Sequence, residues 1–283
     1  MSFRAAGDTR IRIGEVLDRI GLLSAAVGLR ERYVARRTPH GPEIAPDGLP
    51  LPPPQLRLRV QGRSADWRRF LRTGTALAGL VQESLAGADT AIERFDRVLD
   101  FGCGCGRVAR NWVGIDGVDI HGCDCDEDQI EWCRRNLPNM DVRLTTLSPP
   151  TTYEPDSFDF VCALSVFTHM NEELQHAWIE EFRRLLRPGG MLLFTTLGSE
   201  WAHRRLRYSD LSRFETGGLV VQRPGLSGTS ACTAYHPREY VTTALLDGFM
   251  PVTFRDGSAE AALRQDAYLV RAPSGRASPG SAS

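Results

Sequence analysis

"VLDFGCGCGRVAR", residues 98–110, places three alternating glycines directly behind a short apolar run. Alternate glycines let a backbone turn sharply and approach a ligand, because no Cβ stands in the way. The glycines follow a predicted strand over 97–101 and open a predicted helix over 107–113, which is where parallel α/β sheets bind their ligands. This stretch therefore predicts a ligand-binding turn at the carboxyl edge of a sheet.

Strand-like and helix-like segments alternate on the carboxyl side of this turn. Asp126 with Gln129, and Asn171, are predicted to begin two of the helices, because their side chains can cap a helix start. The expected strands are 119–124, 140–146, 158–165 and 191–197, and the expected helices are 127–136 and 172–187. This alternation predicts a parallel sheet that is covered on both faces. Two later strand-like runs, 251–256 and 265–272, predict a hairpin added to the sheet edge.

The chain is predicted to have three parts. Residues 1–65 form an N-terminal helix, expected over 11–37, and an arm over 38–55 that holds seven prolines. Residues 66–272 form the α/β domain, which starts with a helix whose apolar residues recur at three- and four-residue steps. Within it, 198–250 is the expected lid over an acceptor, and 273–283 is expected to be a disordered tail.

Composition excludes several classes of function. The net charge is −1, so no overall field attracts nucleic acid or anionic lipid. All 34 basic residues are arginines, which excludes Schiff-base chemistry on a lysine. No apolar run reaches the roughly 18 residues of a membrane span. The first residues do not resemble a secretory signal, so we expect a cytoplasmic protein with reduced cysteines.

An acid at the end of the second expected strand suggests what the turn binds. Asp124 lies eighteen residues after Gly106, where a carboxylate can accept hydrogen bonds from both ribose hydroxyls. The turn reads G-x-G-x-G, whereas a dinucleotide site is expected to read G-x-G-x-x-G. A pyrophosphate also needs a well-formed helix N-terminus. We therefore predict an adenosine site for a ligand without phosphates.

The turn resembles the first motif of the class I S-adenosylmethionine-dependent methyltransferases, and three further blocks resemble that family in order and spacing. These blocks are "HGCDCDEDQIEWC" (121–133), "PDSFDFVCALSVFTHM" (155–170) and "EEFRRLLRPGGMLLFTTLG" (180–198). The resemblance covers about residues 66–272. It implies a doubly wound, Rossmann-like sheet of seven strands, mostly parallel with an antiparallel last strand. It also implies S-adenosylmethionine as cofactor and S-adenosylhomocysteine as product.

The resemblance also assigns expected roles to particular residues. Around the methionine part of the cofactor it places Asp100, Gly102, Gly104 and Gly106. Asp124 would hold the ribose, Cys125 would lie against the adenine, and Ser165 would lie near the cofactor carboxylate. Thr146 and Leu147 stand where the family usually has an acid that contacts the adenine amino group. Here a backbone contact or the Thr146 hydroxyl would have to replace that acid.

Two C-x-C pairs allow other interpretations of the same segments. Four thiolates, from Cys103, Cys105, Cys123 and Cys125, could form a zinc site or a redox pair. Alternate residues of a strand point to opposite faces, which opposes a shared metal. We therefore predict no metal, and expect small buried or loop-lining thiols.

Two histidines are candidates for a catalytic base, because a hydroxyl acceptor usually has to lose its proton. His169 follows the fourth strand, and His236 lies in the segment where the family contacts its substrates. The segment after the fourth strand lacks the planar amide or acid that accepts an amine proton, which disfavours a DNA base. "SPPT" (148–151) resembles such a motif but follows the third strand instead.

The sequence thus predicts methyl transfer to a small molecule, such as a sugar, a glycan precursor or a secondary metabolite, more at oxygen than at nitrogen. RNA or protein methylation and a non-catalytic cofactor-binding role stay open, whereas a nicotinamide oxidoreductase is opposed by the form of the turn. The expected partner is the acceptor, with no membrane, and nucleic acid is disfavoured. The N-terminal arm is a candidate contact for a homodimer.

Overall fold

The computed structural model describes residues 23–62, 64–258 and 264–275, with side chains described from residue 28 onward. The predicted helix over 11–37 is therefore seen only from Leu23, as α2 (Leu23–Arg37), and its earlier part lies outside the described residues. Most of the expected tail, 276–283, also lies outside them. The chain divides into two compact units, with the division between Phe70 and Leu71.

The first unit is organised around one buried arginine. Arg57 lies on α3 (Pro54–Gln61) and is 1% exposed. Its guanidinium donates hydrogen bonds of 2.6–3.1 Å to the carbonyls of Pro39, His40, Pro52 and Ala65. A buried charge is costly unless it is hydrogen-bonded, and guanidinium has five N–H groups to offer. The proline-rich arm, whose prolines cannot form a regular helix, is thus folded around Arg57.

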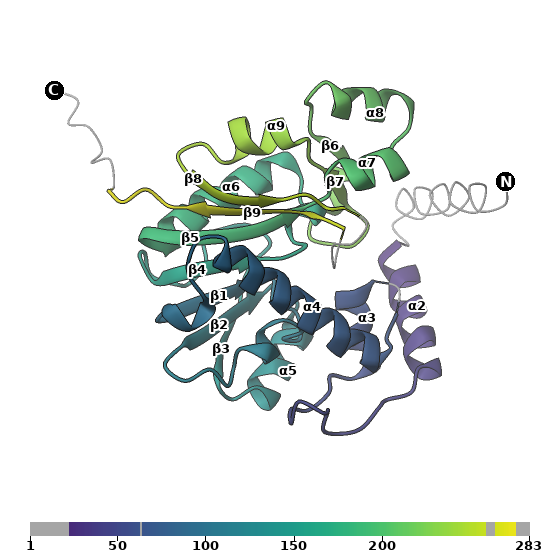
Figure 1. Cartoon of the computed structure of the whole chain (residues 1–283). Helices are drawn as coiled ribbons and strands as arrows, with labels where there is room; N and C mark the ends of the chain where they lie inside the picture. Colours follow the sequence, from purple (N-terminus) through teal and green to yellow (C-terminus); the bar gives the residue numbers. More distant parts are fainter. Residues whose placement is uncertain (1–22, 63, 259–263, 276–283) are drawn as a thin grey trace. The chain divides into compact units, whose positions relative to one another are not determined.

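The second unit contains the predicted seven-stranded sheet (Figure 1), with strand order β3-β2-β1-β4-β5-β9-β8. The first five strands are parallel, and β9 pairs antiparallel with both β5 and β8, as predicted. The strands are β1 (Arg97–Phe101), β2 (Asp119–Asp124), β3 (Met140–Leu144), β4 (Phe158–Ala163), β5 (Leu186–Thr196), β8 (Met250–Arg255) and β9 (Asp266–Arg271). The strand order reverses between β1 and β4, which is where open α/β sheets bind ligands.

Helices cover both faces of the sheet (Figure 1). On one face α6 (Glu172–Leu185) inserts Trp178 and Phe182 against Phe101 of β1, with ring centroids 4.5 and 4.8 Å apart. The opposite face carries α4 (Trp67–Ala86) and α5 (Glu127–Asn136). The predicted caps are confirmed, because Asp126 accepts from the Gln129 N–H and Asn171 accepts from the Leu174 N–H.

The prediction of a helix over 107–113 is wrong. Only a 3-10 helix over Ala109–Asn111 forms there, between turns. Valine and asparagine are poor helix formers, and the Asn111 amide donates to the Val108 carbonyl instead of extending a helix. The strand expected over 158–165 ends at Ala163, because Ser165 adopts a positive φ of 63°.

The segment 198–250 forms a small substructure with its own apolar cluster and a two-stranded sheet (Figure 1). The cluster joins Ala202, Leu206, Phe214, Val220 and Tyr235. Its elements are α7 (Ser199–Arg205), α8 (Tyr208–Glu215), β6 (Val220–Gln222), β7 (Thr233–Tyr235), α9 (Arg238–Tyr240) and a π-helix over Val241–Leu245. β7 also bridges to Leu197 at the end of β5, so the substructure is joined to the carboxyl edge of the sheet.

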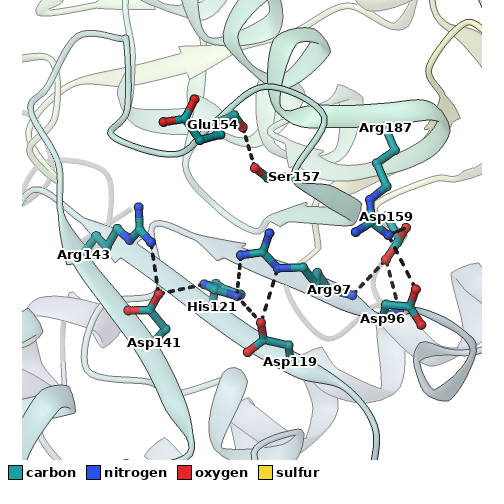
Figure 2. Close-up of polar contacts among 10 residues, drawn as sticks. All are labelled: Asp96, Arg97, Asp119, His121, Asp141, Arg143, Glu154, Ser157, Asp159 and Arg187. Atoms are coloured by element: carbon teal, nitrogen blue, oxygen red, sulfur yellow. Dashed lines mark hydrogen bonds and ion pairs between the residues drawn. The ribbon is translucent and has the colours of Figure 1, made fainter.

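The amino edge of the sheet is held by charged side chains (Figure 2). His121 on β2 lies between two carboxylates, with Nε2 2.7 Å from Asp119 and Nδ1 3.2 Å from Asp141. Arg97 and Arg143 each pair with one of these carboxylates at 3.3 Å. Both acids are about half exposed, so each pair contributes little on its own. This network lies at the end of the strands opposite to the glycine turn.

The contact between α4 and the glycine turn generates a stability prediction. A Cβ added to Gly74 would lie 2.2 Å from the Arg107 carbonyl oxygen, whereas one added to Gly79 on the same helix meets nothing within 4 Å. We expect Gly74→Ala to lower the free energy of unfolding by about 1–3 kcal/mol through overpacking. Gly79→Ala should raise it by about 0.5–1 kcal/mol. Urea denaturation of both variants checks this, and equal effects would contradict it.

Candidate functional site

The three glycines of the turn have positive φ angles of 71°, 55° and 71° at Gly102, Gly104 and Gly106. The N–H groups of Gly102 and Cys103 donate to the Cys123 carbonyl at 2.8 and 3.1 Å, which ties the turn to the end of β2. A Cβ on Gly106 would come within 2.4 Å of the buried Leu137 side chain. Glycine is therefore required by the turn's own packing, before any ligand is considered.

Asp124 joins the glycine turn to the start of α5. One carboxylate oxygen accepts from the Gly104 N–H at 2.8 Å and the other from the Asp126 N–H at 2.9 Å. Burial raises the pKa of this carboxyl, and the two N–H bonds oppose that shift. Each oxygen keeps a further lone pair, so Asp124 can still accept hydrogen bonds from a ligand lying over the turn.

Asp100 is a buried acid at the end of β1, only 3% exposed. Burial raises its pKa to about 7, with a smaller upward contribution from the charge of Asp124 and an opposing one from the Ala109 N–H. Its Oδ2 atom is buried and has no hydrogen-bond partner. Buried polar atoms are nearly always paired, so this oxygen is suited to a donor or cation supplied by a ligand.

Ser165 begins the segment after β4 and is held by two residues from other parts of the chain. Its N–H donates to the Thr195 hydroxyl at 2.8 Å, and its hydroxyl accepts from the Gln265 amide at 2.9 Å. The Thr195 hydroxyl in turn donates to Gln265 at 2.7 Å, which closes the network. Gln265 was not among the predicted site residues; its only signal in the sequence is a polar side chain just before an apolar strand.

The residues expected near the adenine lie on exposed loops. Cys125 is exposed as a residue, but partial burial of its thiol, with the charge of Asp124, raises its pKa to about 11. Thr146 uses its hydroxyl on the Ser148 carbonyl, and the Leu147 carbonyl accepts from the Trp178 indole at 3.0 Å. The Thr146 hydroxyl donates its proton here and keeps a lone pair that can still accept a hydrogen bond.

His169 is held in one tautomer by a backbone carbonyl. Its Nδ1 lies 2.8 Å from the Cys232 carbonyl oxygen, which can only accept, so Nδ1 carries the proton and Nε2 the lone pair. Burial lowers the pKa of this imidazole, which favours its neutral form. The same loop is fixed by a bond from the Gly228 N–H to the His169 carbonyl at 2.8 Å.

His236 occupies a different environment from His169. It is completely buried, and its Nε2 lies 2.9 Å from the Gln175 side-chain oxygen. The Gln175 amide donates to the Met170 carbonyl, so its oxygen must be the acceptor and His236 Nε2 the donor. Burial lowers the pKa of His236 to about 3. These contacts favour a role in packing for His236.

Most cysteine thiols of the two C-x-C pairs are buried, as predicted. Cys103, Cys105 and Cys123 are buried and free, and only Cys125 is exposed. The Cys103 and Cys133 thiols lie 3.5 and 3.4 Å from the Gly104 carbonyl, beneath the turn. Within the described residues, no three His, Cys, Asp or Glu side chains are grouped to hold a metal ion.

In that part of the chain, no helix is both long and apolar enough to cross a bilayer.

Residues 98–190, which contain the turn, Asp124 and His169, match a protein family described as "Methyltransferase domain". The malonyl-[acyl-carrier protein] O-methyltransferase of Enterobacter lignolyticus is 32% identical over 38% of this chain and 41% of its own length. The ubiquinone biosynthesis O-methyltransferase of Thiobacillus denitrificans is 29% identical over 36% and 44%. The chain thus spans less than half the length of these curated relatives.

Solved structures show the same fold. The 1,6-didemethyltoxoflavin-N1-methyltransferase of Burkholderia thailandensis, solved with S-adenosylhomocysteine, matches with a TM-score of 0.52 and 16% identity. The match covers 77% of this chain and 85% of that one. The family match over residues 98–190 and the shared fold support a class I S-adenosylmethionine-dependent methyltransferase.

Proposed function

We propose that this protein transfers the methyl group of S-adenosylmethionine to a hydroxyl group of a small molecule. The observation that carries the proposal is the pairing of Asp124 with the Gly104 N–H, beside the unpartnered Oδ2 of Asp100. This arrangement offers acceptors for two ribose hydroxyls and for an ammonium group, which are polar parts of the cofactor. The curated relatives named above are O-methyltransferases, which supports oxygen as the methylated atom.

The residues present suit this cofactor. Asp124 would hold the ribose through its remaining lone pairs, and Asp100 would hold the ammonium group, whose charge favours the ionised carboxylate. When bound, the cofactor supplies a methyl group already activated by a sulfonium. The protein's task is then to align the acceptor, exclude water and receive its proton.

His169 is the candidate for receiving that proton. Its Nδ1–H bond to Cys232 leaves the Nε2 lone pair available, and the described residues offer Nε2 no hydrogen-bond partner. Its lowered pKa keeps the ring neutral near pH 7, so it is ready to act as a base. His236, with a pKa of about 3 and an engaged Nε2, is the weaker of the two candidates.

The acceptor class is proposed as a sugar, a glycan precursor or a secondary metabolite. The absence of an amine-handling motif after β4 and the net charge of −1 support this over an amino group or nucleic acid. The segment 198–250 is proposed to cover the acceptor. We further propose a cytoplasmic location, in keeping with seven free cysteines, and a homodimer formed through the N-terminal arm.

Calorimetry with S-adenosylhomocysteine tests the cofactor assignment. We expect a Kd in the micromolar range and no binding of NADH. Asp124→Ala should weaken binding by about 2–3 kcal/mol, because two hydrogen bonds to a charged acceptor are lost. Glu127→Gln, which changes an equal charge on the exposed start of α5, is the control. If the folded wild-type protein does not bind, the proposed function is wrong.

Asp100 should make this binding depend on pH. Its pKa of about 7 in the ligand-free protein means that the carboxyl is neutral below pH 7 and must ionise to hold the ammonium. Affinity should therefore fall by up to about tenfold per pH unit below 7 and level off above it. Asp100→Asn should bind weakly at all these pH values. Calorimetry from pH 5.5 to 8.5 on both proteins measures this pH dependence. If the affinity of Asp100→Asn changed with pH as steeply as that of the wild type, Asp100 would not be the group that holds the ammonium.

The stability of the ligand-free protein should respond to pH with the opposite sign. Because the pKa of Asp100 is raised from 3.8, its protonation favours the folded state. This contribution is fully present below pH 3.8 and is lost as the pH rises through 7. Denaturation of the wild type and Asp100→Asn over this range provides an independent check on the same group.

His169→Gln should separate a base from a structural histidine. Glutamine can still donate to the Cys232 carbonyl but cannot accept a proton. We expect kcat to fall by about 10²–10⁴ with an acceptor that supports turnover, while the Kd of S-adenosylhomocysteine changes little. His236→Gln should instead lower the melting temperature. Release of S-adenosylhomocysteine is the readout, and an unchanged kcat in His169→Gln would remove this residue from the mechanism.

A further inference from the structure

Three side chains from separate parts of the chain form a closed cycle of hydrogen bonds at the carboxyl edge of the sheet. The Ser165 N–H donates to the Thr195 hydroxyl at 2.8 Å, and this hydroxyl donates to the Gln265 side-chain oxygen at 2.7 Å. The Gln265 amide then donates to the Ser165 hydroxyl oxygen at 2.9 Å. Thr195 is fully buried and Gln265 is 8% exposed, so the cycle lies where a low dielectric strengthens hydrogen bonds.

The cycle holds Ser165 in a backbone conformation that is unfavourable for its residue type. Its φ of 63° lies in the left-handed region, which glycine adopts with far less strain than serine. The Ser165 carbonyl also accepts from the Thr168 hydroxyl at 2.9 Å. Such strain persists only where surrounding contacts hold it, and it is concentrated at functional sites. Thr195, Gln265 and Thr168 supply those contacts.

Ser165 lies beside the glycine turn and the buried acid at the end of β1. Asp100 on β1 pairs in register with Cys162 on β4, so Asp100 and Ser165 lie near the carboxyl ends of neighbouring strands. The residue after Ser165 packs on the turn, because a Cβ added to Gly102 would lie 2.6 Å from Val166 Cγ2. Ser165 itself is only half-buried, so a ligand over the turn can reach it.

We propose that Gln265 is a positioning residue that turns the Ser165 hydroxyl proton outward, as a donor to the carboxylate of the bound cofactor. A hydroxyl has one proton and two lone pairs, and the Gln265 amide occupies a lone pair, which leaves the proton for a ligand. A carboxylate accepts such a bond strongly, whereas the ammonium group proposed for Asp100 can only donate. This inference rests on the proposed function and deepens it.

The competing explanation is that the cycle only holds the backbone of Ser165, in which case the direction of donation would not matter. Gln265→Glu separates the two explanations. An ionised carboxylate of nearly the same shape accepts from both Thr195 and Ser165, so it keeps the cycle but turns the Ser165 proton inward. Ser165→Gly instead removes the hydroxyl, and glycine suits the positive φ at this position.

The test uses calorimetry at pH 8 on the full chain with two ligands. One is S-adenosylhomocysteine, and the other is its decarboxylated analogue, which keeps the adenosine and the amine and lacks only the carboxylate. Gln265→Glu and Ser165→Gly should each weaken binding of S-adenosylhomocysteine about tenfold or more and leave binding of the analogue unchanged. Asp100→Asn should weaken both ligands. Gln55→Glu, which adds the same charge at an exposed position of α3, should change neither.

A double-mutant cycle separates donation by Ser165 from the charge that Gln265→Glu adds. If Gln265 acts through Ser165, Gln265→Glu should have little further effect on S-adenosylhomocysteine binding in the Ser165→Gly background. A full further loss in that background would reveal repulsion by the new charge and overturn the positioning role. Thermal melting shows whether each variant is folded. If Gln265→Glu is not, Gln265→Met takes its place and should show a smaller loss with the same selectivity.

The two proposals fail in different ways. If S-adenosylhomocysteine binds to the wild type and equally tightly to Gln265→Glu, the positioning role alone is overturned. Equal weakening of both ligands in a folded Gln265→Glu would overturn it as well, because the carboxylate would not be the group concerned. If the folded wild type binds neither ligand, the proposed function is wrong, and the role of Gln265 falls with it.

Discussion

The bond between the Asp124 carboxylate and the Gly104 N–H is the constraint on which the candidate site depends. It joins the turn after β1 to the end of β2, while the second carboxylate oxygen holds the N–H of Asp126 at the start of α5. A carboxylate that accepts backbone N–H bonds keeps its place without any ligand. The side of the site proposed for the cofactor is therefore formed in advance, which would lower the cost of binding.

The strands around this turn could be predicted because the residues that favour them are neighbours in the sequence. β1 is a short, mostly apolar run followed by Gly102, β2 ends at Asp124, and the caps Asp126 and Asn171 are recognisable from residue type and spacing. The helix expected after the turn does not form: the Asn111 side chain bonds to the Val108 carbonyl, and Gly74 of α4 packs closely against the Arg107 carbonyl. A contact with a distant helix leaves no trace in the spacing of residues 107–113.

The two histidines proposed for the acceptor side could be predicted even less well from the sequence alone. His169 and His236 were equivalent candidates by position, yet one is fixed by a loop carbonyl and the other is enclosed behind Gln175. Burial and tautomer depend on partners about sixty residues away in the chain, as the separations of 63 and 61 residues show. Gln265 could not be predicted for that reason, because it acts on Ser165 and Thr195 through contacts made only after folding.

The position of β9 has a consequence for how the chain is made. β5 ends at Thr196, but its neighbour in the sheet is built from residues 266–271, after the whole of 198–250 has been synthesised. During synthesis the parallel half of the sheet therefore keeps the edge of β5 unpaired. Unpaired strand edges attract other chains. That edge of β5 therefore stays open to other chains until the residues of β9 have been made and pair with it.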